Sequence, residues 1–287
     1  MKTMALQWYP GHMNKAKNQV QDRLKLVDIV LEIVDARLPF SSRNPVLEQI
    51  IDQKKHIIIL NKSDLADPKV TADWKLNFEQ EGTKSIELDA KHNKGLGKIK
   101  SLIRSELSDK IDRYERNGVQ NYRIKAMCIG IPNVGKSTIL NRFVGKNVAI
   151  TGNKPGVTKN QNWLKTNIGI DLLDTPGILW PKIDDPKVGM KLALSGAIKD
   201  KIYAPDDVAI YALNFMETHY MDQLLESYKL DKSDIFNHTT PEVLMNLTKK
   251  FGYKDDYDRA SRRIIDDVRK LKLGRLTFDI PGEFYEE

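Results

Sequence analysis

Short apolar runs alternate with longer amphipathic segments through the first 180 residues of the chain. Four of these runs are rich in β-branched residues and have the length of strands: 28–36, 56–64, 85–91 and 122–131. Helical segments separate them, one near 45–53 and another that ends at Gly118. Strands that alternate with helices in this way predict a mostly parallel sheet with helices on both faces.

The pattern changes after residue 185. A helix from Lys136, a loop through Thr158 and two strand-like runs at 160–167 and 169–177 complete the α/β part. Three later segments have the apolar spacing of amphipathic helices: 205–228, 240–252 and 256–276. We therefore predict an α/β domain with a basic N-terminal segment over 1–185 and an all-helical domain over 186–287.

Composition narrows the class of protein. With 40% hydrophobic and 30% charged residues, the chain has the profile of a folded, soluble protein. The single cysteine, Cys128, excludes an internal disulfide and favours a reducing compartment, so we expect the cytoplasm. No apolar run is long enough to span a bilayer, and the net charge of +7 favours a polyanionic partner such as nucleic acid.

The segment GIPNVGKS, Gly130 to Ser137, has the spacing of a phosphate-binding loop and lies between a predicted strand and a predicted helix. In such a loop backbone N–H groups surround the phosphates, Lys136 reaches the β and γ phosphates, and Ser137 offers a hydroxyl to Mg²⁺. The nucleotide-binding residues expected here are Asn133, Val134, Gly135, Lys136, Ser137 and Thr138. A simple helix cap, the alternative, does not require the full spacing.

The segment Asp174 to Gly177, DTPG, ends the last apolar strand and lies downstream of the loop by about one helix and two strands. Asp174 is placed to bind the metal ion, and the Gly177 N–H to meet the γ phosphate, as in a GTPase switch. Thr158 is then the candidate threonine that closes over Mg²⁺ and acts in catalysis with Lys136. Alone, DTPG is an ordinary turn.

The segment Asn61 to Asp64, NKSD, follows its strand directly and suits recognition of guanine. The Asp64 carboxylate can accept hydrogen bonds from the ring N–H and the exocyclic amine of guanine, whereas adenine lacks that pair of donors. We therefore expect Asn61, Lys62 and Asp64 to bind the nucleotide. One strand later, the Ala90 backbone and the Lys91 side chain complete the base pocket.

The order of these motifs is unusual. In an ordinary GTPase the phosphate loop precedes the base-reading motifs, but here 61–91 comes before 130–137, Thr158 and Asp174. The order predicts a circularly permuted P-loop GTPase fold, in which the helix ending near Gly118 joins the former termini.

With this order, the chain resembles the circularly permuted GTPases of ribosome assembly. The matching segments span nearly the whole length: WYPGHM, VDARLP, NKSD, GIPNVGKST, PGVTK, DTPGI and the helical C-terminal part. The resemblance implies a GTP-hydrolysing factor that binds the large ribosomal subunit precursor and its rRNA and promotes late maturation. In the base pocket, Asp89 stands where serine is common in the family.

Two other functions remain open at this stage. One is an RNA-binding assembly scaffold in which GTP is a structural ligand. The other, a small-molecule P-loop kinase, is disfavoured by the NKSD segment. We expect a monomer with GTP or GDP, Mg²⁺ and ribosomal RNA as partners, and no membrane partner.

The catalytic chemistry departs from most small GTPases, which have glutamine directly after the switch glycine. Here Ile178 occupies that position and cannot orient or deprotonate water. His12 is the leading replacement, because imidazole titrates near neutral pH and the resemblance favours it. A surface or structural histidine is the alternative, and the four other histidines lack a motif and are interpreted as structural: His56, His92, His219 and His238.

Asn133 resembles the asparagine by which potassium-dependent relatives bind a monovalent cation. A K⁺ ion there would stabilise developing charge in place of an arginine finger. The alternative is that Asn133 only stabilises its turn.

Two groups of basic residues are candidate RNA contacts, with an ordinary solvated helix face as the alternative. The first group is Lys2, Lys15, Lys17, Arg23 and Lys25, and the second is Arg259, Arg262, Arg263, Arg269, Lys270, Lys272 and Arg275.

Overall fold

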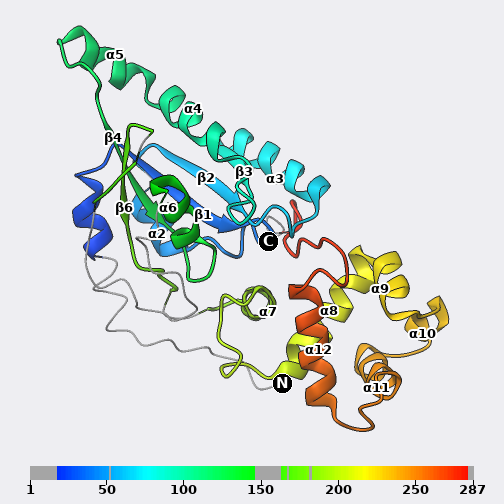
Figure 1. Ribbon diagram of the computed structural model, residues 1–287. Helices are drawn as coiled ribbons and strands as arrows, with labels where there is room; N and C mark the ends of the chain where they lie inside the picture. Colours follow the sequence, from blue (N-terminus) through cyan, green and yellow to red (C-terminus); the bar gives the residue numbers. More distant parts are fainter. Residues whose placement is uncertain (1–17, 52, 146–162, 167, 181–182, 284–287) are drawn as a thin grey trace. The chain divides into compact units, whose positions relative to one another are not determined.

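The computed structural model describes residues 18–51, 53–145, 163–166, 168–180 and 183–283. Within them, the strands form one sheet in the order β3-β2-β1-β4-β6-β5 (Figure 1). The strands are β1 (Ile29–Asp35), β2 (His56–Asn61), β3 (Lys84–Leu88), β4 (Ile124–Ile129), β5 (Trp163–Lys165) and β6 (Ile170–Asp174). Neighbouring strands are parallel except the short β5, which is antiparallel to β6. The predicted mostly parallel sheet is confirmed.

Helices cover both faces of this sheet. They are α2 (Pro45–Ile51), α3 (Pro68–Gln80), α4 (Leu96–Glu106), α5 (Ser108–Arg116) and α6 (Lys136–Val144), and residues 18–24 are also helical. On one face, Leu47 and Ile51 of α2 pack against β1 and β4, and Trp74 and Phe78 of α3 pack against β1 and β2. The strand order places α4, α5 and α6 over the opposite face, because the connections between parallel strands are right-handed.

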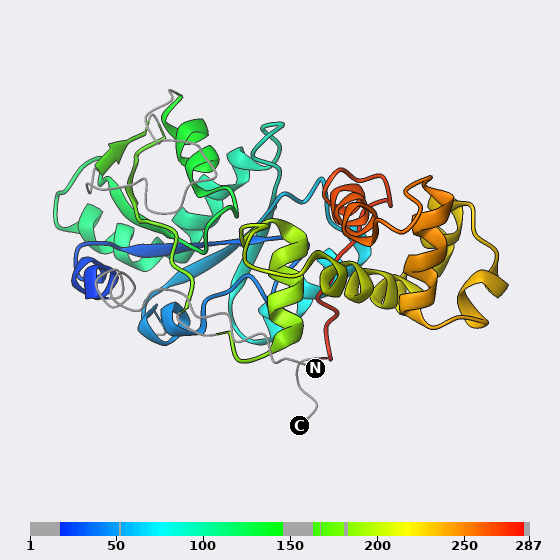
Figure 2. The ribbon, with the colours of Figure 1, turned by 90° about the horizontal axis from the view of Figure 1, so that it is seen from below.

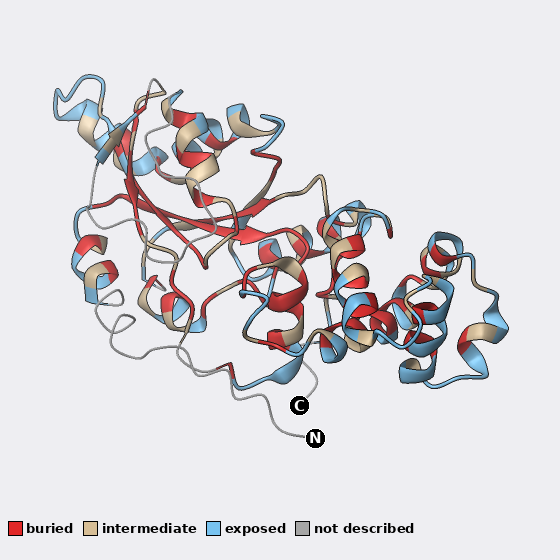
Figure 3. Cartoon of the chain, turned by 60° about the horizontal axis from the view of Figure 1, so that its bottom comes forward, coloured by how far each residue is buried: buried red, intermediate tan, exposed pale blue. Residues whose placement is uncertain are grey.

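The central strands are buried on both faces (Figure 3). All seven residues of β1 are buried, which explains why five of them are apolar without a polar–apolar alternation. The two charged residues, Glu32 and Asp35, are each paired with basic side chains. The polar residues at the carboxyl ends of these strands are therefore held on a rigid base.

The chain separates into two compact units. We call them the α/β unit, whose described residues are those up to 180 and 279–283, and the helical unit, 183–278. The helical unit contains α7 (Pro186–Ser195), α8 (Pro205–His219), α9 (Met221–Tyr228), α10 (Lys232–Phe236), α11 (Thr240–Lys250) and α12 (Tyr257–Arg269). Helix α12 packs against α7, α8 and α11 (Figure 2). Among the described helices of both units, none has the length and apolar character needed to cross a membrane.

The segment 205–228, whose apolar spacing continues without interruption, forms two helices instead of one. Tyr220 separates α8 from α9 with φ −140° and ψ 40°. Its buried hydroxyl accepts a hydrogen bond from the Thr277 N–H over 3.2 Å and lies 3.3 Å from the Thr277 carbonyl oxygen, to which it donates. The break is therefore fixed by a contact with residues far along the chain.

The end of the chain returns to the α/β unit after Phe278, the last residue of the helical unit. The Asp279 carboxylate is fully buried and accepts hydrogen bonds from the N–H groups of Phe40, at 2.9 Å, and Ser41, at 2.6 Å, and from the Ser41 hydroxyl, at 2.7 Å. The Asp279 carbonyl accepts a further hydrogen bond from Trp74 Nε1 over 2.8 Å. The chain is thus anchored to the α/β unit on both sides of the helical unit.

Candidate nucleotide-binding site

The sequence motifs of the α/β unit gather at one edge of the sheet. Strand β2 ends at Asn61 and β6 at Asp174, while β3 and β4 lead directly into Asp89 and the phosphate loop. Because the strands are parallel, their carboxyl ends share this edge, which is where open α/β sheets bind ligands.

The phosphate loop requires glycine at two positions. Gly130 has φ +149°, and a Cβ there would lie 2.3 Å from the Ile33 carbonyl oxygen. Gly135 has φ +98°, and a Cβ there would lie 2.2 Å from Asn61 Nδ2. Any larger residue would displace the loop from β1 or from Asn61.

Lys136 begins α6 and is buried beneath the phosphate loop. Its Nζ donates hydrogen bonds to the carbonyl oxygens of Gly130, at 2.9 Å, and Ile131, at 3.0 Å. Burial lowers the pKa of the ammonium to about 8, although the Asp174 carboxylate opposes this shift. A nucleotide phosphate would offer the ammonium a stronger, charged acceptor than these carbonyls.

Asn61 connects three of the motifs through both ends of its side-chain amide. Its Nδ2 donates to the Val134 carbonyl in the phosphate loop over 2.7 Å, and its Oδ1 accepts from the Ala90 N–H over 3.2 Å. Asn61 is 2% exposed, so both hydrogen bonds are shielded from water. Its contribution is to position the phosphate loop relative to the loop after β3, residues 89–91, which we call the base loop.

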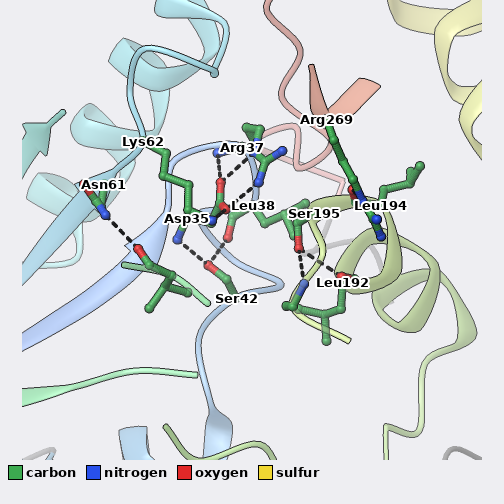
Figure 4. A network of polar contacts seen from close by, with 12 residues as sticks. Asp35, Arg37, Leu38, Ser42, Asn61, Lys62, Leu192, Leu194, Ser195 and Arg269 are labelled. Carbon is green, nitrogen blue, oxygen red and sulfur yellow. Dashed lines mark hydrogen bonds and ion pairs between the residues drawn. The ribbon is translucent and has the colours of Figure 1, made fainter. Parts of the chain in front are cut away.

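Asp35, at the end of β1, is the centre of a buried charge network (Figure 4). Its Oδ2 lies 2.8 Å from Lys62 Nζ and 2.7 Å from an Arg37 terminal nitrogen, and its Oδ1 accepts from Arg37 Nε over 2.9 Å. The two cations hold the pKa of the Asp35 carboxyl well below its usual range, despite the opposing effect of burial. Lys62, which the sequence assigns to the nucleotide, is therefore fixed by Asp35.

Two carboxylates and a histidine lie together where the sequence predicts the base pocket. Asp89 is buried, and its Oδ1 accepts from the His92 N–H over 2.9 Å while its Oδ2 lies 2.8 Å from His92 Nδ1. The same nitrogen lies 3.8 Å from Oδ2 of the half-buried Asp64. His92, interpreted from the sequence as structural, thus lies beside the carboxylate expected to recognise guanine.

Arg142 of α6 also holds the base loop in place. It donates to the Ala90 carbonyl over 3.1 Å and to the Lys91 carbonyl over 2.9 Å. The Lys91 side chain is exposed, as expected for a residue that packs on a base. Sequence reasoning missed Arg142, and the only local signal was its place in the helix that follows the phosphate loop.

The switch segment begins where β6 ends beside β4. Asp174 pairs in register with Cys128, and the Thr175 hydroxyl donates to the Cys128 carbonyl over 2.6 Å. Burial raises the pKa of Asp174, while the nearby Lys136 ammonium acts in the opposite direction. A Cβ on Gly177 would lie 2.9 Å from Pro132 and 3.1 Å from Lys136 Nζ. The switch glycine is therefore directly beside the phosphate loop and its lysine.

Of the other residues expected at the site, three are described by the structure and two are not. Ser137 and Thr138 are half-buried in the first turn of α6, and Asn133 has φ +63°. His12 and Thr158 lie outside the described residues.

Arg23 corrects one expectation about the basic residues. Expected at the surface as an RNA contact, it is 4% exposed, and burial lowers the pKa of its guanidinium even though Asp174 and Asp22 oppose this shift. Its place in the helix that covers the sheet, one position before the apolar Leu24, removes it from the surface.

Arg269, also expected to contact RNA, is a second basic residue whose surroundings differ from that expectation. Its guanidinium is bound within the helical unit to the carbonyls of Ala193 and Leu194 and to Asp200 and Tyr203, so it is a structural residue.

Known proteins share this sequence and this fold. Residues 125–249 match the family described as 50S ribosome-binding GTPase. The chain is 46% identical to ribosome biogenesis GTPase A of Bacillus pumilus, over 97% of this chain and 99% of the relative. It is also 46% identical to ribosome biogenesis GTPase A of Priestia megaterium, over 98% of each chain. The crystal structure of GNP-bound YlqF from T. maritima has a similar fold, with a TM-score of 0.61 and 27% identity over 93% of this chain and 99% of that one.

These comparisons confirm the P-loop GTPase fold with permuted motif order. The family match begins at residue 125, at the strand before the phosphate loop, so Asn61 to Asp64 precede it in the chain.

Proposed function

The chain belongs to the ribosome biogenesis GTPase A family and hydrolyses GTP to GDP and phosphate; from this premise we propose that it binds the precursor of the large ribosomal subunit and promotes its late maturation, with its nucleotide state controlling the association. The observation that carries the proposal is the arrangement around Asn61. It joins the phosphate loop to the base loop, so that one nucleotide can contact both.

Residues of the phosphate loop and of the switch segment bind the triphosphate. Lys136 contacts the β and γ phosphates, and the Gly177 N–H, beside it, meets the γ phosphate. Asp64 pairs with guanine, and Lys91 packs on the base. A switch glycine in contact with the phosphate loop suits a γ-phosphate sensor, because loss of that phosphate removes its ligand.

Mg²⁺ is the cofactor that GTPases of this type generally use, and the residues present fit it. Ser137 and Asp174 supply a hydroxyl and a carboxylate, the oxygen ligands that Mg²⁺ prefers, and Asp174 is 8% exposed. Thr158 would provide a further oxygen. Held there, Mg²⁺ would neutralise charge on the phosphates of the nucleotide.

His12 and Asn133 are the proposed supports for hydrolysis. His12 would orient or deprotonate the attacking water, because the buried Ile178 side chain cannot. Asn133 would bind K⁺ near the developing charge. Its left-handed backbone conformation, φ +63°, places an asparagine where most residues are strained.

The helical unit supplies a surface for rRNA. Five of its candidate basic residues are exposed on α12 and the segment after it: Arg259, Arg262, Lys270, Lys272 and Arg275. Arg259 stacks over the ring of Tyr253 at 4.2 Å, and Arg263 over Phe251 at 3.9 Å. Cations interleaved with aromatic rings suit contact with phosphates and bases. Asp258 and Asp266, which pair with Arg262 and Lys270, weaken the positive potential.

Phosphate release and co-sedimentation with large ribosomal subunits test this function together. We expect the subunit to stimulate multiple-turnover GTP hydrolysis, and the protein to co-sediment more strongly with a nonhydrolysable GTP analogue than with GDP. Stable co-sedimentation that is independent of nucleotide, without stimulated turnover, would instead favour the scaffold function. Absence of both effects would reject the proposal.

A further inference from the structure

Asn44 links the loop after β1 to the switch segment. Its Nδ2 donates a 2.8 Å hydrogen bond to the Ile178 carbonyl, although the two residues are 134 positions apart. Its Oδ1 accepts from the Val46 N–H over 3.0 Å at the start of α2. Asn44 is 2% exposed, so water cannot replace either partner easily.

Ile178 is consequently fixed at both of its backbone polar groups. Its N–H lies 3.3 Å from the Gly130 carbonyl in the phosphate loop, and its carbonyl is bound by Asn44. Gly177 immediately precedes it, in contact with Pro132 and close to Lys136. The hydrogen bond from Asn44 therefore sets the direction in which the chain leaves the switch glycine.

The loop that carries Asn44 is held in place by other buried contacts. The Asp279 carboxylate binds the N–H groups of Phe40 and Ser41. The Ser42 hydroxyl accepts from the Asp35 N–H over 2.9 Å and donates to the Leu38 carbonyl. Asn44 is thus presented to the switch from a rigid support, as a group that positions another must be.

We propose that Asn44 is a positioning residue for GTP hydrolysis. By binding the Ile178 carbonyl it places the Gly177 N–H for the γ phosphate, which GTP has and GDP lacks. Asn44 touches neither the nucleotide nor the water, and it affects the reaction only through the switch backbone. The inference depends on the expected contact between Gly177 and the γ phosphate.

The two ends of the Asn44 amide can be separated by substitution. Asn44→Asp keeps an oxygen to accept from the Val46 N–H and so preserves the start of α2. It removes the donor and turns a carboxylate toward the Ile178 carbonyl. Asn44→Ala removes both functions. Asn214→Asp, an exposed position in the helical unit, is the control for an added negative charge.

The measurements are single-turnover GTP hydrolysis without ribosomes and the dissociation constants of GDP and a nonhydrolysable GTP analogue. For Asn44→Asp we expect a fall of about tenfold in both the hydrolysis rate and the preference for the analogue over GDP, with GDP affinity close to wild type at a temperature where the variant is folded. The melting temperature should fall, because the new carboxylate is buried against a carbonyl oxygen. Asn214→Asp should match wild type throughout.

Two outcomes would overturn the inference. One is an Asn44→Asp variant with the wild-type rate and nucleotide preference. The other is an equal loss of affinity for both nucleotides, which would make Asn44 a residue of general stability. Because ribosomes are absent, failure here is distinguishable from failure of the proposed role in subunit maturation, which the co-sedimentation experiment tests.

Discussion

The side-chain amide of Asn61 donates a 2.7 Å hydrogen bond to the carbonyl of Val134, so the end of β2 is joined directly to the phosphate loop. These residues are 73 positions apart in the chain. The contact explains how a motif that precedes the phosphate loop in sequence can complete the same site.

Replacing Asn61 should therefore weaken binding of the whole nucleotide. Asn61→Ala removes the two hydrogen bonds that hold the phosphate loop and the base loop in place before the nucleotide binds, so an ordering cost of about 1–3 kcal/mol falls on binding. We expect GTP and GDP affinities, measured by calorimetry, to fall together by about 5-fold to 150-fold. Asn246→Ala, at an exposed position on α11, is the control, and unchanged affinities in Asn61→Ala would contradict the bridging role.

Asp64 should determine the choice of base. The amide nitrogen that Asp64→Asn introduces cannot accept from guanine but can donate to the oxygen that xanthine has at the corresponding position. We expect the variant to lose most of its affinity for GDP and to bind xanthosine diphosphate more tightly than wild type does, by roughly one to two orders of magnitude in each case.

Competition of both diphosphates against a fluorescent GDP measures this change of base preference. Asp73→Asn, at an exposed position on α3, removes the same charge away from the site and should leave the preference for guanine unchanged. An Asp64→Asn variant that still prefers GDP as strongly as wild type would show that another group reads the base.

Asp35 should stabilise the fold through its two cations. Asp35→Asn leaves the buried charges of Arg37 and Lys62 without their counterion, so we expect the free energy of unfolding to fall by about 3–5 kcal/mol in urea titrations. Glu87→Gln, which breaks the more exposed pair with Lys75, should cost about 1 kcal/mol or less. Equal effects of the two substitutions would contradict a special role for Asp35.

The same network gives the wild-type protein a pH dependence of known sign. The pKa of Asp35 is lower in the folded protein than in the unfolded chain, so on acidification the unfolded chain takes up the proton first. The stabilisation is complete above a pH of about 4 and decreases below it. Asp35→Asn should therefore show a weaker loss of stability than wild type as the pH is lowered from about 4.

Potassium should accelerate hydrolysis if Asn133 binds a monovalent cation. We expect faster single-turnover hydrolysis in K⁺ than in Na⁺ at equal ionic strength. Asn133→Gly should remove the difference, because glycine accepts the φ of +63° without strain and lacks the side-chain oxygen that would bind the ion. Equal rates of the wild-type protein in the two salts would reject the cation site.

The sheet and the location of the main motifs could be predicted from sequence, because they depend on local signals. Apolar runs of strand length define the parallel strands, and the carboxyl ends of parallel strands share one edge. The positions of Asn61 and Lys136 at that edge follow directly. The NKSD and GIPNVGKS segments have fixed spacing, so even their reversed order in the chain was informative.

The contacts that hold the site together could not be predicted in this way. Asn44 binds Ile178, and Arg142 binds the base loop, across separations for which a single sequence gives no periodic signal. Arg23 shows the opposite error, since a charged residue in an amphipathic segment suggests a surface position and this one is buried. The break at Tyr220 likewise depends on its hydrogen bonds with Thr277.

Because the chain returns to the α/β unit at Asp279, the helical unit is an insertion that is connected to the α/β unit at both of its ends. A protein shortened to end at residue 278 would keep every helix of that unit but would lose a buried acceptor of three hydrogen bonds beneath the loop that carries Asn44. Removing the last few residues would thus loosen a loop that lies 238 positions earlier in the sequence. One proteolytic cut between the units would leave them still joined by the second covalent connection.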